Sequence, residues 1–176
     1  MNLARIYKFC TRCSHPLKKK NSTEFICTKC GLHIFLNPAS TNGLILENDK
    51  GQILLVKRKF EPRKGWWDTP GGFIGLKETV EESLKREIRE ELNIEIKDFF
   101  YFGNYWSYYP YQGIDYQTLY FVYRGKYKGE KIKTGDDVTD YKFFDKKNIP
   151  FDKISFNDVK SAIKDYVKKF PNSRAI

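Results

Sequence analysis

Three glutamates in the middle of the chain have the residue type and spacing to bind one metal ion together. Glu90 and Glu91 follow Glu87 by three and four residues, so one helix would place the three carboxylates side by side. Such pairs of like charge each destabilise a helix by about 0.2–0.5 kcal/mol, whereas a divalent cation removes the repulsion. The spacing therefore predicts a Mg²⁺ site. The alternative is an acidic helix face that contacts only solvent.

Four cysteines form a second group with the spacing of metal ligands. Two residues separate Cys10 from Cys13 and also Cys27 from Cys30, and thirteen residues lie between the pairs. This spacing is typical of a tetrahedral Cys₄ zinc ribbon, with redox-active or unrelated cysteines as the alternative. A region this short cannot build a sufficient core without metal, so the expected Zn²⁺ is structural.

The glutamates need a helix to position them, and the surrounding residues predict one from Thr79 to Leu92. Thr79 and Glu82 have the spacing of a capping box, and Asn93 tolerates the left-handed conformation that ends many helices. Apolar residues recur at every fourth position: Val80, Leu84, Ile88 and Leu92. At about 100° per residue, the three glutamates lie beside this apolar stripe, whereas the other charges face away from it.

The rest of the chain predicts strands around this helix and a second one, which is typical of an α/β sandwich with a mixed sheet. A hairpin turn is expected at 48–51 and the second helix over 155–170. Residues 1–36 hold every cysteine and form the expected ribbon, and residues 37–176 form the second domain. Strands are expected in six segments: 44–46, 53–56, 66–68, 94–102, 116–123 and 141–144.

The composition favours a folded protein with an anionic partner. A chain of 176 residues allows one fair-sized domain and a small satellite, and 40% hydrophobic residues suit a packed core. A formal net charge of +10 favours nucleotides, nucleic acid or an acidic surface as partner, or else reflects lysines on solvated faces. The chain has no apolar run of about 20 residues and no signal-peptide pattern, which predicts a cytoplasmic protein without a membrane partner.

The segment from Gly72 to Ile94 resembles the Nudix box. Glu78 follows Gly72 after five residues, and Arg86 begins the run through Glu91 to Ile94 after seven more. Two positions differ, because an asparagine replaces the last glycine of the box and a glycine stands where many members carry an acidic residue. The resemblance implies the Nudix fold, an α/β/α sandwich with a mixed sheet. It also implies hydrolysis of a diphosphate bond by a water molecule that Mg²⁺ or Mn²⁺ activates.

The same resemblance assigns roles to residues. The three glutamates match the metal ligands, one of which would also orient or deprotonate the water. Glu78 and Arg86 match the pair that braces the loop against the helix. Similar enzymes add a carboxylate from a late loop, for which Asp137 is the candidate, with a plain turn residue as the alternative.

The candidate substrate residues come from three segments. Gly71 and Gly72 let the backbone approach a ligand closely, and Arg58 could meet a phosphate or only cap the edge of the sheet. An aromatic loop, residues 105–113, could stack on a base or a nicotinamide ring. The equal alternative is a hairpin or homodimer contact in which the rings bury one another. The rings concerned are those of Trp106, Tyr109 and Tyr111.

A zinc ribbon before a Nudix domain resembles the arrangement in NADH pyrophosphatases. The implied substrate is NADH, ADP-ribose or a similar dinucleotide. Only a serine, an aromatic residue and one proline remain of the motif of those enzymes, and Pro110 is loosely similar to the proline of ADP-ribose hydrolases. Two other functions stay open: removal of a nucleotide 5′ cap from RNA, and binding of nucleotide or RNA without turnover. The complete set of glutamates favours an enzyme.

Overall fold

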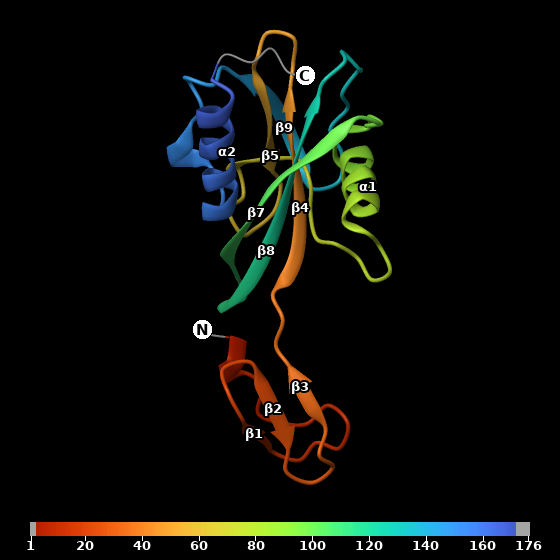
Figure 1. The fold of residues 1–176 in the computed structure, drawn as a ribbon, viewed down its shortest axis with the longest axis vertical. Coiled ribbons are helices and arrows are strands. Elements are labelled where there is room, and N and C mark those ends of the chain that lie inside the picture. The colour runs from red at the N-terminus through yellow and green to blue at the C-terminus, as the bar shows by residue number, and fades with distance from the viewer. Residues whose placement is uncertain (1–2, 172–176) are drawn as a thin grey trace.

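The computed structural model describes residues 3–171, so the outermost residues of both expected domains, 1–2 and 172–176, lie outside it. Its strands form two separate sheets (Figure 1). The smaller one is antiparallel and follows a short 3-10 helix, η1 (Leu3–Arg5). Its strands are β1 (Leu17–Lys19), β2 (Glu24–Cys27) and β3 (His33–Phe35).

The larger sheet has the order β6–β5–β4–β8–β7, with β9 paired to β5. Strands β4 and β8 pair in parallel and the other neighbours pair antiparallel, which confirms the predicted mixed sheet. Helices α1 and α2 cover opposite faces of it (Figure 1). The elements are β4 (Ala39–Glu47), β5 (Ile53–Arg58), β6 (Trp67–Asp68), α1 (Val80–Leu92), β7 (Phe99–Tyr111), β8 (Ile114–Lys126), β9 (Val138–Phe144), η2 (Phe151–Lys153) and α2 (Asn157–Lys169).

The continuous apolar runs of β4 and β5 are explained by a sheet that is covered on both faces. Successive side chains of a strand point to opposite faces. Leu44 and Leu46 accordingly join a core with α1, whereas Ile45 between them joins a core with α2. In β5, Leu54 packs toward α1 and Leu55 toward α2 in the same way. The sheet is therefore a rigid layer between two separate cores.

Helix α1 begins and ends where the sequence predicts. The Thr79 side chain accepts from the Glu82 backbone N–H, and the Glu82 side chain accepts from the Thr79 N–H, which completes the capping box. At the other end Asn93 is left-handed (φ 54°, ψ 38°), and its N–H donates to the Arg89 carbonyl. Over residues 3–171, no helix is long and apolar enough to cross a bilayer.

Two predicted segments differ in the structure. The strand expected at 94–102 starts only at Phe99, because Ile94 is buried in the core beneath α1 and the chain from there to Asp98 has no strand partner. The aromatic segment expected as a loop at 105–113 is instead mostly the second half of β7, so the structure shows the hairpin that was the alternative. A two-residue turn joins β7 to β8, and both of its residues, Gln112 and Gly113, have positive φ, which matches a tight hairpin.

Candidate active site and cysteine cluster

A cavity of about 250 Å³ opens beside α1 and reaches the start of α2. Its lining comes from helix α1, the start of α2, strands β4 to β9, and the loops before α1 and β9. One group of lining residues is acidic: Glu87, Glu90, Glu91, Asp136 and Asp137. Another is aromatic: Phe73, Tyr108, Tyr109, Tyr120 and Phe156. The cavity thus combines oxygen ligands for a cation with flat apolar surfaces.

Helix α1 presents the three glutamates to this cavity in different environments. Glu91 is only 5% exposed, and one of its carboxylate oxygens accepts the Gly71 N–H at 2.9 Å. Burial raises the pKa of Glu91 well above its usual value and also raises the pKa of Glu87. Glu90 lies nearer the surface. The side chains of Glu87 and Glu91 are therefore held in place, whereas Glu90 is the more open of the three.

The glycine pair before the helix is required by close contacts. A Cβ atom on Gly72 would lie 2.6 Å from the Glu87 carboxylate, so any side chain there would displace that carboxylate. Gly71 has φ 138°, and a Cβ there would lie 2.4 Å from the carbonyl oxygen of Asn42. The loop therefore passes directly over the carboxylate-bearing face of α1. This contact brings its backbone into the cavity.

Arg86 connects the loop to the glutamates. Its guanidinium donates to both carboxylate oxygens of Glu78, at 2.7 and 3.0 Å, which lowers the pKa of Glu78 to about 2. The structure thus brings together the pair that the sequence assigns to bracing the loop. Arg86 Nη1 also donates to Glu87 at 2.7 Å and to Glu90 at 3.0 Å, contacts that the sequence analysis did not identify.

The acidic group fits a hard divalent cation by its chemistry, since all its donors are carboxylate oxygens. The neighbouring charges of Glu87 and Asp137 help to raise the pKa of Glu91, which reports the like-charge repulsion that a cation would relieve. Arg86 supplies part of that positive charge to Glu87 and Glu90 in this structure. Glu87, Glu90 and Glu91 are the residues that could hold Mg²⁺ or Mn²⁺.

The late loop reaches the site through backbone contacts. Gly135 donates its N–H to the Glu91 carbonyl at 3.0 Å, and the Asp137 carbonyl accepts the Lys59 N–H at 2.8 Å. Asp137 therefore lies in the cavity lining beside the helix, where the sequence analysis expects it. Asp136 lines the same cavity and was missed, because nothing in a Gly-Asp-Asp turn distinguishes one aspartate from the next.

The structure separates the predicted substrate residues. Tyr109 lines the cavity, where its ring centroid lies 5.4 Å from that of Phe73 and 5.2 Å from that of Phe156. Trp106 is 69% exposed, Tyr111 is 43% exposed, and neither ring lines this cavity. Strand alternation places Trp106 on the face of β7 opposite to Tyr109.

Arg58 lies at the aromatic group of the cavity. Its guanidinium stacks over the Phe156 ring at 5.0 Å and donates to Asp68 at 3.2 Å. A second donated hydrogen bond, to the Pro62 carbonyl at 2.9 Å, fixes its orientation. Arg58 thus places a positive charge in a cavity whose other charged groups are mainly acidic.

The sequence analysis missed three further residues of the lining, Asp68, Phe156 and Asp158. Asp158 is 7% exposed, and burial raises its pKa to about 6. At the start of a predicted helix, an aspartate is expected to cap the helix and face solvent, so the pattern gives no signal for burial. The packing of α2 against β7 and β8 brings Asp158 into the cavity.

Asp158→Asn is expected to stabilise the protein at pH 8 and not at pH 4. A carboxyl whose pKa rises from 3.8 to about 6 on folding contributes stability below pH 3.8 that is lost as pH rises through about 6. The free energy of unfolding that the Asp158 carboxyl contributes at low pH, and loses at high pH, is about 3 kcal/mol at most. Urea unfolding at the two pH values measures it. Asp165→Asn, an exposed change on the same helix, is the control, and an equal effect of Asp158→Asn at both pH values would contradict the assignment.

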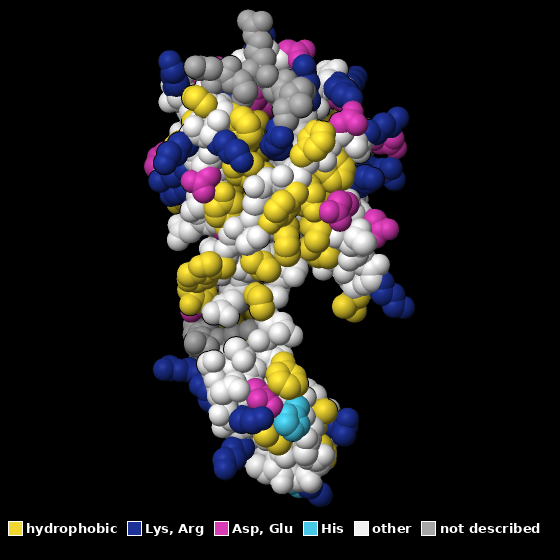
Figure 2. All heavy atoms as spheres, in the orientation of Figure 1, with side chains coloured by type: hydrophobic (Ala, Val, Ile, Leu, Met, Phe, Trp, Pro, Cys, Tyr) yellow, Lys and Arg dark blue, Asp and Glu magenta, His cyan; other side chains and the backbone are white. Residues whose placement is uncertain are grey.

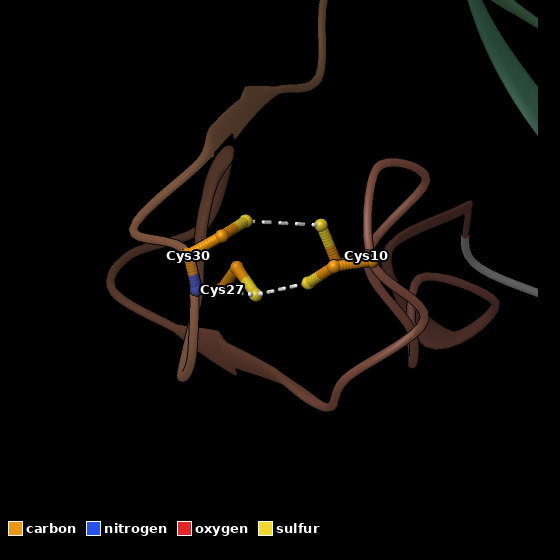
Figure 3. A group of neighbouring side chains, drawn as sticks. Cys10, Cys27 and Cys30 are labelled. Carbon is orange, nitrogen blue, oxygen red and sulfur yellow. Dashed lines mark hydrogen bonds between the residues drawn. The ribbon is translucent and has the colours of Figure 1, made fainter.

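The four cysteines converge in the small domain. The Sγ atoms of Cys10 and Cys30 lie 3.7 Å apart, those of Cys13 and Cys27 lie 3.4 Å apart, and all four lie within 4.8 Å of one another (Figure 3). Tetrahedral Zn–S bonds of about 2.3 Å would place the sulfurs about 3.8 Å apart, so the cluster fits Zn²⁺. The backbone N–H groups of Cys30 and Lys29 donate to Cys27 and lower its pKa to about 6, which favours the thiolate.

Comparisons with known proteins agree with this architecture. Residues 37–164 match a family model described as the NUDIX domain. An ADP-ribose pyrophosphatase from Methanocaldococcus jannaschii is 38% identical over 135 residues, which are 77% of this chain and 76% of that protein. The NAD-capped RNA hydrolase NudC of Haemophilus influenzae is 32% identical over 104 residues, 57% of this chain but only 39% of the relative.

A solved structure extends the similarity to nearly the whole chain. The crystal structure of a NUDIX hydrolase from Nitrosomonas europaea superposes with a TM-score of 0.69 at 27% identity, and covers 92% of this chain and 91% of that one. The family match spans well over half of the chain and includes the glycine pair, α1 and the late loop. The chain belongs to the Nudix hydrolase family.

Proposed function

We propose that this protein hydrolyses the diphosphate bond of a nucleoside diphosphate that is linked to a second group, with ADP-ribose as the first substrate to test. The observation that carries the proposal is that one cavity holds both the three glutamates and the Tyr109–Phe156 ring pair. The similarity to an ADP-ribose pyrophosphatase over three quarters of both chains supports it.

The reaction would use the acidic group for charge and the aromatic group for position. Glu87, Glu90 and Glu91 would hold Mg²⁺ or Mn²⁺, which neutralises diphosphate oxygens and lowers the pKa of bound water. Water adds to one phosphorus, the anhydride P–O bond breaks, and ADP-ribose gives AMP and ribose 5-phosphate. Tyr109 and Phe156 would contact the base, and Arg58 would attract the phosphates.

The ribbon would have a structural role and the Nudix domain a catalytic one. We place the boundary between residues 36 and 37, with Zn²⁺ on Cys10, Cys13, Cys27 and Cys30 as a structural ion of the first part. Residues 37–176 would carry catalysis. Removal of a nucleotide cap from RNA is the second candidate, which the similarity to an NAD-capped RNA hydrolase and the net charge of +10 support.

A substrate panel tests the proposal. Purified protein with Mg²⁺ is incubated with ADP-ribose, NADH, a dinucleoside polyphosphate, a nucleotide sugar and NAD-capped RNA, and the released mononucleotide is measured. We expect AMP from ADP-ribose at a kcat/KM above that for the nucleotide sugar. Activity on capped RNA alone would favour the second candidate. No release from any substrate, with Mg²⁺ or Mn²⁺, would overturn the hydrolase proposal.

Tyr109→Ala is expected to lower kcat/KM on the best substrate by about 5- to 150-fold, since one stacked ring contributes about 1–3 kcal/mol. Phe100→Ala is the matched control, because it removes a half-exposed ring from the same strand at a position outside the cavity. Loss of NADH turnover with ADP-ribose turnover retained would place Tyr109 at the nicotinamide. Unchanged kcat/KM together with lost dimerisation would instead make this part of β7 a subunit contact.

A further inference from the structure

The small N-terminal domain carries most of the net charge of the chain. Residues 3–36 hold seven of the basic residues and one acidic residue, so this fifth of the chain contributes a charge of +6 to the total of +10. All seven basic side chains are exposed. Figure 2 shows Lys and Arg side chains on several sides of this domain. The basic residues are Arg5, Lys8, Arg12, Lys18, Lys19, Lys20 and Lys29.

Its one carboxylate is withdrawn from the surface. Glu24 is 7% exposed, and it pairs with Lys20 at 3.1 Å and with His33 at 2.7 Å. Asn21 donates a further hydrogen bond to it at 3.2 Å. Residues 3–36 therefore expose almost no carboxylate charge. Zn²⁺ on four thiolates would add a net charge of −2 and leave this segment at +4, so it would still attract an anionic polymer.

One face of the small sheet is open to solvent and carries an aromatic ring. The strand register places Lys18, Ile26 and His33 in one row across the three strands. Phe35 lies in the next row of the same face, opposite Glu24, whose carboxylate is neutralised by Lys20 and His33. Phe35 is 60% exposed and stacks on His33 with centroids 6.1 Å apart. The opposite face holds Phe25, which is buried against Tyr7. We call the exposed face, with Lys18, His33 and Phe35, the ribbon face.

We propose that the ribbon face binds single-stranded nucleic acid, with a base stacked on Phe35 and the phosphates beside Lys18 and the other exposed basic residues. An exposed ring on a sheet surrounded by positive charge is the arrangement that binds single strands without sequence preference. A lipid surface would require a broader apolar patch to enter the bilayer, and the ribbon face offers one exposed ring.

The ribbon face is also close enough to the hydrolytic cavity for one strand to reach both. Five residues separate Phe35 from Thr41, which lines the cavity, so the six steps between them place their backbones at most about 20 Å apart. At about 3.4 Å per phosphate, about six nucleotides span that distance. Figure 1 shows the small sheet attached at the start of β4, the strand that carries Thr41.

The test measures binding without hydrolysis, so its result is independent of the proposed enzymatic function. A fluorescent twelve-nucleotide RNA with a 5′-hydroxyl, which has no diphosphate to cut, is titrated with the zinc-loaded full chain and followed by anisotropy. We expect Phe35→Ala to weaken binding by about 5- to 150-fold. Lys18→Gln should reduce the slope of log K against log salt concentration by about 0.7.

Two matched variants of the body serve as controls. Phe100→Ala removes a ring of similar exposure from β7, and Lys168→Gln removes an exposed charge from α2, so both should bind the RNA like the wild type. Zinc content should be equal in all variants. The proposal is overturned if the wild type does not bind at low salt, if Phe35→Ala binds as tightly as Phe100→Ala, or if the chain binds phosphatidylserine vesicles and no RNA.

Discussion

Glu91→Gln is expected to lower kcat by at least about 10²-fold while the protein stays folded. Glu91 is the most buried of the three glutamates, and its carboxylate is fixed by the Gly71 N–H at the cavity wall. The glutamine keeps an oxygen that can accept this hydrogen bond, so the fold is retained while the charge is lost. Removal of one preorganised electrostatic contact at a reacting centre typically costs about 10²- to 10³-fold. Steady-state kinetics on the best substrate of the panel measure the effect.

Glu87→Gln should give a loss of similar size, because Glu87 faces the same loop at Gly72. Glu95→Gln is the matched control, since Glu95 follows α1 directly and its side chain is exposed, with Arg89 as partner. Thermal unfolding of each variant separates lost chemistry from lost structure. Full activity in both Glu91→Gln and Glu87→Gln would refute the metal assignment.

The double variant Cys27→Ser, Cys30→Ser is expected to lose its zinc and to unfold residues 3–36. Zinc binding contributes about 10–16 kcal/mol in small domains of this kind, which residues 3–36 cannot replace with their own core. That core is small: in residues 3–36 the buried apolar side chains are Cys10, Phe25 and Cys27. Metal analysis measures the zinc content of the variant. Amide hydrogen exchange measures the protection of backbone N–H groups separately in the small and the large sheet.

Thr28→Ser is the control for this variant, because it lies between the two cysteines and keeps the hydroxyl that donates to the Pro16 carbonyl. It should retain one zinc per chain and full protection. Exchange in the large sheet should change little in either protein, since its two cores contain no residue of the ribbon. Zinc retained in the double variant would contradict the four-cysteine site.

The local parts of the fold could be predicted because they depend on residues close in sequence. The capping box at Thr79, the left-handed Asn93 and the four-residue repeat of α1 are all short-range patterns, and the structure has each of them. The aromatic segment was misread because its tyrosines signalled stacking, whereas its conformation follows from pairing with β8, fifteen or fewer residues ahead. Strand length is set by the partner strand, which local patterns do not show.

The cavity could be predicted only where the family resemblance supplies the residues. The contact between Gly72 and Glu87 follows from the box, but the approach of Asp158 and Phe156 depends on how α2 docks on the sheet. Asp158 accepts a hydrogen bond from Thr118, which lies 40 residues away along the chain. No sequence periodicity links residues so far apart, so they can be identified as cavity residues only from the three-dimensional packing.

The contacts of Arg86 give the two candidate metal sites different relations to folding. Arg86 gives Glu87 and Glu90 a positive neighbour that is part of the protein itself, which offsets part of their mutual repulsion without an ion. Binding of Mg²⁺ by Glu87 and Glu90 would then require the Arg86 guanidinium to release these two carboxylates. Its ion pair with Glu78 could remain. In the described part of the ribbon no cationic side chain pairs with the cysteine sulfurs, whose hydrogen-bond partners there are backbone N–H groups and one another. If both sites bind the metals proposed above, zinc would be needed for the ribbon to fold, whereas magnesium would be needed only for hydrolysis.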